Sequence, residues 1–204
     1  ILTQRTITVQ AAAGEGGSVV SGHADATTAK TYYYGGEGFD ITYAIDAFEK
    51  TGHTPTGWTF NVGGTQNVTD ASILSNGKYL IDFEQYGVTS YFGQTITVTR
   101  TYTANTYKLY FDADGGTISA EGSGIIEETV GRWYKNVTYG QAIGKLPTAT
   151  KTGYIFGGWG VSATDAYNTP SDKTVTAIWS ANTFKVQLDA NGGTISGSNR
   201  QVLS

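Results

Sequence analysis

The sequence predicts a mostly β protein made of small tandem repeat units in an extended array, and three observations support this fold class. An ungapped comparison of residues 95–119 with residues 172–196 gives 14 identities in 25 positions, at an offset of 77 residues. Self-similarity at a fixed long period is typical of tandem repeats. The 28 Gly and 14 Tyr, with only 15% of residues charged, indicate short strands joined by glycine turns. Several short runs also alternate between apolar and polar residues, as strands with one buried face do.

The second unit, residues 105–181, has the clearest pattern. It opens with Tyr107–Phe111, where apolar residues alternate as in a strand. Asp114-Gly115 follows and predicts a type I′ hairpin turn, since both central residues of that turn need positive φ. We expect the return strand at Ile118 and Ile125-Ile126, with residues 121–124 as a loop or bulge. The remaining expected elements are strands within 133–140, 151–159 and 174–179, and a short helix at Gln141–Lys145 that ends at Leu146-Pro147.

The first unit, residues 1–104, is interpreted as a diverged copy of the second. Its Lys50-Thr51-Gly52 and Gly57-Trp58 match Lys151-Thr152-Gly153 and Gly158-Trp159 at an offset of 101. About 24 extra residues then fall between about 61 and 87. This insert has its own apolar pattern, and we expect it to be an added hairpin. Residues 182–204 predict the start of a third, truncated unit, which needs a neighbour because an isolated hairpin is marginally stable.

The composition excludes several classes of partner. The chain has 204 residues, is 39% hydrophobic and carries a formal charge of −4, which is enough apolar material for folded cores. It has no basic stripe, so nucleic acid is excluded as a partner. Its apolar runs are short, so no membrane insertion is expected. It has no Cys, hence no disulfide or Cys-based zinc site. It has no Met and opens on Ile1, so we expect a segment of a longer polypeptide, with any signal peptide or anchor outside it.

Three groups of residues carry a family resemblance. The stretches FDADGG and LDANGG, VTYGQAIGKLPTATKTGYIFGGW, and TVTAIWSA resemble the Listeria–Bacteroides repeat, also called the internalin B B-repeat. The resemblance covers about Tyr107–Ala181, and the first unit resembles a divergent form of the same repeat. The family implies β-grasp-like modules strung in tandem on secreted or wall-attached bacterial surface proteins, with roles in display, adhesion or host contact, and it implies no catalytic residues. Gly131–Lys135 and the insert depart from the family pattern.

Metal binding and catalysis are both disfavoured by the sequence. Asp112 and Asp114 suggest calcium, but an EF-hand spacing fails because Gly116 stands in the fifth position and Ser123 in the twelfth. The two carboxylates fit a turn that tolerates left-handed backbone better. Only His23 and His53 could serve as histidine bases, and no nucleophile motif accompanies them. We therefore expect no metal site, no cofactor and no enzymatic activity.

The aromatic residues are the one group for which a binding role competes with a structural one. Trp58 and Trp159 recur at matched positions and are predicted to lie in the cores. The candidate ligand-binding residues are Trp133 and Tyr134, which have no such counterparts, and Tyr32 and Tyr33, which belong to a tyrosine cluster in the first unit. Exposed aromatic rings stack on sugars and dominate protein interfaces. The alternative is that these rings cap the core or the junction between units.

Together these features predict a non-catalytic repeat segment of a bacterial surface protein, located outside the cell. The segment would act as a spacer or display stalk, with adhesion to a host surface as an added role through repeated weak contacts. Its partners would be the neighbouring repeat units and a host protein or glycan. The main alternative is a glycan- or host-protein-binding module that uses exposed aromatic residues, and an enzyme is a distant third.

Overall fold

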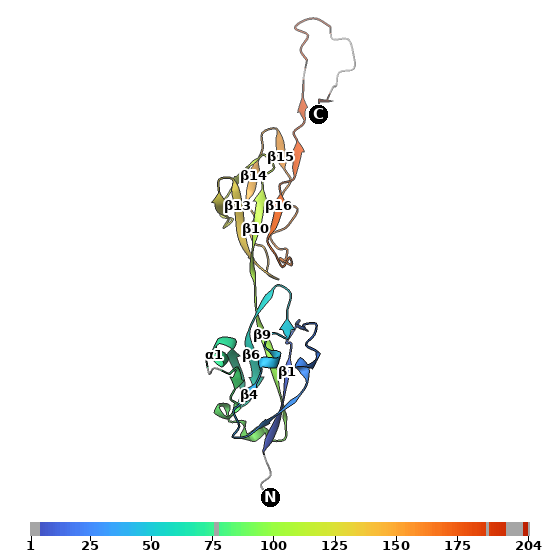
Figure 1. The fold of residues 1–204 in the computed structure, drawn as a ribbon. Helices are drawn as coiled ribbons and strands as arrows, with labels where there is room; N and C mark the ends of the chain where they lie inside the picture. The colour runs from blue at the N-terminus through green and yellow to red at the C-terminus, as the bar shows by residue number, and fades with distance from the viewer. Residues whose placement is uncertain (1–4, 76–77, 187, 195–201, 204) are drawn as a thin grey trace. The chain divides into compact units, whose positions relative to one another are not determined.

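The computed structural model describes residues 5–75, 78–186, 188–194 and 202–203, and it is mostly β, as predicted (Figure 1). The chain divides into two compact units, unit 1 (Ile1–Asn105) and unit 2 (Thr106–Ser204). Each unit has its own hydrophobic core.

Unit 1 is built on a mixed five-stranded sheet in the order β3-β1-β9-β6-β7. Strands β1 and β9 run parallel, and the other neighbours in this sheet run antiparallel. Its strands are β1 (Thr6–Ala12), β2 (Ser18–Val19), β3 (Lys30–Tyr33), β4 (Phe39–Asp40), β5 (Phe48–Glu49), β6 (His53–Asn61), β7 (Thr65–Thr69), β8 (Leu80–Ile81) and β9 (Thr95–Ala104). Its described residues also form the helix α1 (Asp70–Leu74) and 3-10 helices at Ala24–Thr27, Thr42–Ala44, Phe83–Tyr86 and Val88–Tyr91.

Unit 2 contains a four-stranded sheet in the order β12-β13-β10-β16. Strands β10 and β16 run parallel, and the other two pairs run antiparallel. The strands are β10 (Thr106–Asp112), β11 (Thr117–Ser119), β12 (Ile126–Thr129), β13 (Arg132–Thr138), β14 (Thr148–Thr150), β15 (Tyr154–Phe156), β16 (Lys173–Thr176), β17 (Trp179–Ala181), β18 (Phe184–Lys185) and β19 (Val202–Leu203). Strand β18 pairs with β19. Both strands belong to the predicted third unit, and the division of the chain places them in unit 2.

The two units share one pattern of strand pairing. In unit 1, β1 pairs antiparallel with β3 and parallel with β9, and in unit 2, β10 pairs in the same two ways with β13 and β16. The short ladders also correspond: β2–β5 with β11–β14, and β6–β9 with β15–β17. Trp58 and Trp159 are both buried, which confirms their prediction as core residues.

Period-2 alternation explains which face of each first strand is buried. Ile7, Val9 and Ala11 of β1 enter the core of unit 1, and Leu109 and Phe111 of β10 enter that of unit 2. Successive side chains of a strand point to opposite faces, so the residues between them lie on the outer face of the sheet. On that face the two units differ: β1 places Thr8 and Gln10 there, whereas β10 places Lys108 and Tyr110.

Two local predictions in unit 2 are wrong. Asp114 and Gly115 have the positive φ values of 47° and 80° that the turn needs, but β11 pairs with β14 instead of returning along β10. Gln141–Lys145 is not helical. Ile143 and Gly144 donate their N–H groups to the carbonyls of Asp165 and Ala163, at 2.9 and 2.8 Å, and Gly144 has φ +78°. Because these donors bond to a distant segment, they are not available for local helical turns.

The insert of unit 1 is only partly the hairpin predicted for residues 61–87. Strand β7 does pair with β6, but α1 follows it, and β8 pairs with β4. Thr69 and Ser72 form a reciprocal capping box that starts α1, with the Ser72 N–H donating to Thr69 Oγ1 at 3.0 Å. Phe83 then turns into the core, where it is fully buried. The capping box of Thr69 and Ser72 and the burial of Phe83 therefore replace the rest of the predicted hairpin.

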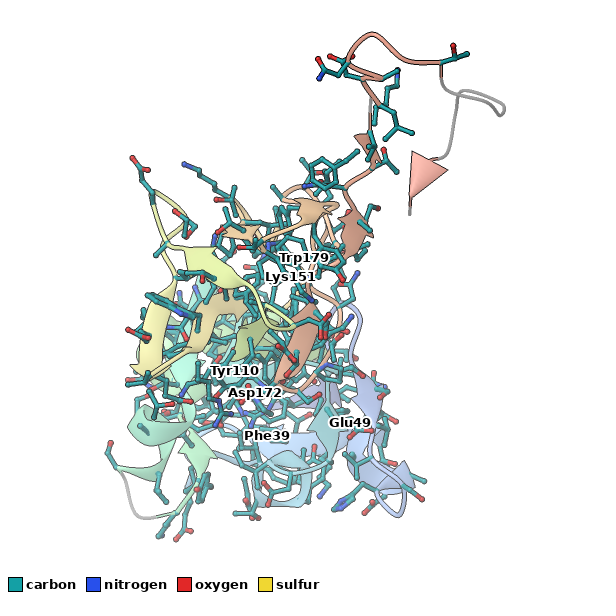
Figure 2. All side chains as sticks on the ribbon, turned by 90° about the horizontal axis from the view of Figure 1, so that it is seen from above. Phe39, Glu49, Tyr110, Lys151, Asp172 and Trp179 are labelled. Atoms are coloured by element: carbon teal, nitrogen blue, oxygen red, sulfur yellow. The ribbon has the colours of Figure 1, made fainter. Side chains whose placement is uncertain are left out.

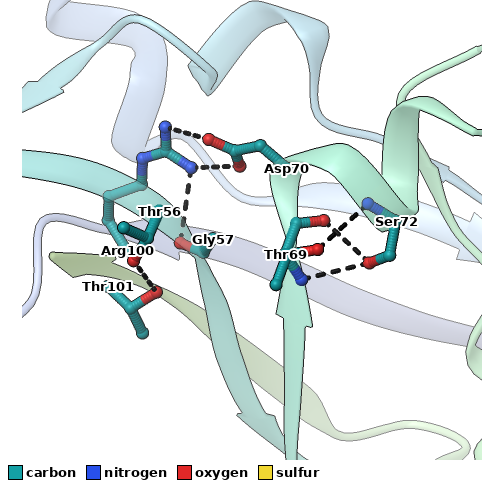
Figure 3. A network of polar contacts seen from close by, with 7 residues as sticks. All are labelled: Thr56, Gly57, Thr69, Asp70, Ser72, Arg100 and Thr101. Atoms are coloured by element: carbon teal, nitrogen blue, oxygen red, sulfur yellow. Dashed lines mark hydrogen bonds and ion pairs between the residues drawn. The ribbon is translucent and has the colours of Figure 1, made fainter. Parts of the chain in front are cut away.

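A buried ion pair ties the insert to the main sheet. Arg100 of β9 has a side chain that is only 3% exposed, and it forms two parallel hydrogen bonds to the Asp70 carboxylate, at 2.5 and 2.8 Å (Figure 3). The same guanidinium donates to the carbonyl of Gly57 at 3.3 Å and lies 4.7 Å from the ring of Trp58. Bidentate geometry of this kind gives the strongest form of ion pair.

Candidate functional site

A groove in unit 1 contains two of the predicted binding residues, Tyr32 and Tyr33. It has a volume of about 370 Å³. All four residues of β3 form one side, and residues 36–40 with Tyr43 form the rest. We call it the β3 groove. Tyr33 is exposed, whereas Tyr32 is 3% exposed and belongs to the core, so the two tyrosines are not equivalent.

Tyr32 of the β3 groove is held by Glu84. The Tyr32 hydroxyl donates to Glu84 Oε1 at 3.1 Å, and the Gly35 N–H donates to the same oxygen. Tyr32 also packs edge-on against Phe83, with ring centroids 5.6 Å apart. Burial raises the pKa of Tyr32, and the neighbouring charge of Glu84 raises it further. Tyr32 is thus a neutral hydrogen-bond donor that anchors β3 to the insert.

The opposite wall of the β3 groove combines aromatic rings with charges. Lys30 places its Nζ 3.1 Å from the centroid of the Tyr43 ring, and Tyr43 meets Phe39 edge-on at 6.1 Å. Asp40 accepts hydrogen bonds from the N–H and hydroxyl of Thr42, at 2.8 and 2.7 Å. Burial raises the pKa of Tyr43, and the charges of Asp40 and Asp25 add to the effect. The wall therefore offers apolar surface bordered by carboxylates.

A second groove lies in unit 2, beside Trp179. It has a volume of about 450 Å³ and is bordered by Thr117, residues 149–152, Tyr154 and Trp179. We call it the Trp179 groove. Lys151 donates to the carbonyl of Asp114 at 2.7 Å, and its Nζ lies 4.8 Å from the Tyr154 ring and 5.8 Å from that of Trp179 (Figure 2). Trp179 Nε1 donates to the carbonyl of Ala113 at 3.0 Å. Lys151 and Tyr154 are not among the binding residues predicted from the sequence, although the Lys-Thr-Gly-Tyr motif contains both.

Trp133 and Tyr134, the other two predicted binding residues, point to opposite faces of β13. Trp133 stands opposite Phe111 and packs against the core of unit 2. Tyr134 stands opposite Tyr110 on the outer face, with ring centroids 5.8 Å apart, and Lys108 Nζ lies 4.4 Å from the Tyr134 ring. The two side chains therefore cannot form one shared platform, since neighbouring strand residues face opposite ways.

Charged groups cross the outer face beside Tyr134. Glu128 accepts from Lys108 Nζ at 2.5 Å and pairs with Arg132 Nε at 3.2 Å. The hydrogen bond from Lys108 lowers the pKa of Glu128 and raises that of Lys108. On this face two cations share one carboxylate, and each cation also lies over a tyrosine ring, Lys108 over Tyr134 and Arg132 over Tyr110.

The described residues contain no group of three or more His, Asp or Glu side chains that could hold a metal ion. The strongly polar pair of Arg100, which is buried, and Asp70, which is 27% exposed, links β9 to the insert. None of the helices in the described residues has the length and hydrophobicity needed to cross a membrane.

The two units share one pattern of strand pairing, and the second of them is similar to a known repeat family. Residues 107–178 match the family model of the Listeria-Bacteroides repeat domain, which confirms the resemblance predicted for the second unit. This family is found in bacterial surface proteins, and the match supports a repeat segment of such a protein. No curated protein matches the chain.

Proposed function

We propose that this chain is a non-catalytic spacer and display segment of a bacterial surface protein, carried outside the cell. The observation that carries the proposal is that two successive units share one pattern of strand pairing, and the second matches a repeat family. Tandem modules of this kind provide reach and surface, because each unit packs against its neighbours in sequence. Adhesion would arise from repeated weak contacts along the array.

Each module is β-grasp-like under this proposal. Support comes from unit 1, where the sheet order β3-β1-β9-β6-β7 places the first and last strands side by side and parallel at the centre. Unit 2 keeps the parallel pair, β10 with β16, at one edge of its four-stranded sheet. Parallel neighbours need a long crossover connection, which the strands between them supply within each unit.

Small-angle X-ray scattering of the chain tests the spacer role. A compact protein of 204 residues has a radius of gyration of about 17 Å. We expect a clearly larger value and a pair-distance distribution with a long tail. A value near the compact one would contradict a spacer, whatever the sites on its surface do.

Glycan binding is a second candidate function, favoured by the Trp179 groove. This groove presents aromatic rings beside the hydroxyls of Thr117, Thr150 and Thr152, a combination that suits sugar rings and their hydroxyl groups. Tyr154 is 43% exposed, so Tyr154→Ala should remove glycan-array binding without unfolding unit 2. Tyr33→Ala, at a comparably exposed tyrosine of unit 1, is the matched control and should leave that binding unchanged. An array with no specific signal would remove this candidate.

A further inference from the structure

We propose that the β3 groove binds an extended, basic polypeptide segment, which joins the sheet of unit 1 as an added strand along β3. This site goes beyond a spacer role and does not depend on it. The proposal rests on the free edge of β3, on the equivalent edge in unit 2, and on the charges around the groove.

Strand β3 is the edge of its sheet, and its hydrogen-bonding groups can be assigned from the register. The Tyr34 N–H donates to the Arg5 carbonyl at 3.0 Å, and the Thr8 N–H donates toward β9, to Gln94 at 2.9 Å. Tyr32 therefore exchanges bonds with Ile7, and Thr31, opposite Thr8, directs its N–H and C=O away from β1.

Backbone donors and an acceptor are thus open on the groove side. The Tyr33 carbonyl is taken by the Gly36 N–H at 3.0 Å, where the chain turns back to form the far wall. The N–H and C=O of Thr31 and the N–H of Tyr33 have no partner among the described residues. Unpaired edge groups of this kind are a template for another strand.

Unit 2 shows what occupies the equivalent edge. Strand β13 corresponds to β3, since each pairs antiparallel with the first strand of its unit. In unit 2 that edge is covered by β12, which runs antiparallel to β13. Unit 1 has no such strand in its described residues: the segment before β3 forms the 3-10 helix Ala24–Thr27, and after β3 the chain passes to β4, which pairs with β8. The added segment would take the place that β12 fills in unit 2.

The charges around the groove select the chemistry of that segment. Glu37 and Asp40 line it, and Glu84 accepts the hydrogen bond of Tyr32, which also lines it. Glu37 forms an exposed ion pair with Lys78 Nζ at 3.2 Å, so a cationic side chain of the segment would compete with Lys78 there. Unit 1 as a whole has nine acidic residues against five basic ones in residues 1–105. The one cation that lines the groove, Lys30, lies over the Tyr43 ring. A segment with Lys or Arg beside an apolar residue would meet carboxylates and aromatic surface together.

An NMR titration of the isotope-labelled chain with short synthetic peptides tests the site. The probe is the capped peptide KVTVK, and its controls are EVTVE and KVTVK methylated on the backbone nitrogens that would face β3. We expect KVTVK to shift the amide signals of Thr31 and Tyr33, with both controls at least about tenfold weaker. Equal binding of EVTVE or of the methylated peptide would overturn the proposal.

Two variants complete the test. Thr31→Pro removes the outward N–H without touching the bonds to β1, and we expect it to weaken KVTVK at least about tenfold. Glu37→Lys reverses a charge that is 82% exposed and should also weaken the peptide. If Thr31→Pro unfolds unit 1, the methylated peptide and Glu37→Lys still decide the question. Signals that shift with a neutral oligosaccharide and not with KVTVK would assign the groove to sugars and overturn the proposal.

Discussion

Units 1 and 2 share their strand pairing but differ in how the core is filled and how the sheet edge is closed. In unit 1 the insert supplies Phe83 and Ile81, both buried, and Asp70, the partner of Arg100. The repeat offset of 77 places Ala177 of unit 2 at the position of Arg100, and Ala177 is also buried. Among the residues that the structure describes, a buried arginine therefore occurs only in the unit whose insert provides its carboxylate.

This difference shows that the insert is an integral part of unit 1. Removing one member of a buried ion pair leaves an uncompensated charge, so Arg100 and Asp70 depend on each other. In unit 2 the small apolar residue Ala177 occupies the position of Arg100 and packs into the core, so no carboxylate is needed there. Substitutions in each unit and a change of pH test how far the two units differ in stability.

The largest effect is expected for Asp70→Ala. It leaves the buried Arg100 guanidinium without its carboxylate and should destabilise unit 1 by roughly 3–5 kcal/mol. Unit 2 should be unchanged. Hydrogen exchange of the whole chain, followed by mass spectrometry, measures the stability of each unit separately, because each unit yields its own peptides.

The matched control is Asp46→Ala, which removes an exposed carboxylate from the same unit. It should leave exchange in both units unchanged. If Asp70→Ala changed exchange in unit 1 by no more than Asp46→Ala, the buried ion pair would have no role in holding the insert.

An intermediate effect is expected at the matched pair Trp179 and Tyr102. Trp179→Phe removes the indole donor to the Ala113 carbonyl, which then accepts from the Gly116 N–H alone, and it also reduces buried surface, at a cost of about 1–3 kcal/mol to unit 2. The Tyr102 hydroxyl is buried and has no hydrogen-bond partner among the described residues, so Tyr102→Phe should leave unit 1 as stable or slightly more stable. Urea unfolding of both variants measures this contrast. A clear loss of stability in Tyr102→Phe would show that its hydroxyl has an unseen partner.

The sequence predicts local geometry better than long-range pairing. Two-residue signals such as Asp114-Gly115 depend on backbone sterics alone, and the positive φ values are found. Which strand pairs next depends on contacts far along the chain, and β11 pairs with β14. Gln141–Lys145 fails as a helix for the same reason, because Asp165 and Ala163 accept its N–H bonds.

The candidate binding residues illustrate the same limit. A cluster of tyrosines marks a region of the surface, but alternation alone does not show which face of a strand is buried. Tyr32 is in the core, Tyr33 borders a groove, and Trp133 and Tyr134 are separated by the sheet. The β3 groove depends on a missing edge partner, a property of topology that no residue pattern in this chain signals.

The smallest effect is expected from alkaline pH, and it should fall mainly on unit 1. Burial raises the pKa of Tyr32, Tyr43 and Tyr102 in unit 1, and of Tyr167 in unit 2. A raised pKa means that the folded state holds its phenolic proton after the unfolded chain has lost it. The stability from these groups is therefore complete below about pH 10 and declines as the pH rises further. At about pH 10.5 one fully protected tyrosine accounts for a loss of about 0.8 kcal/mol.

Urea unfolding followed by methyl NMR signals, at about pH 8 and about pH 10.5, measures the stability of each unit separately. Tyr32→Phe should reduce the pH dependence of unit 1, and an equal loss in both units would show that general charge repulsion, and not the buried tyrosines, controls alkaline unfolding.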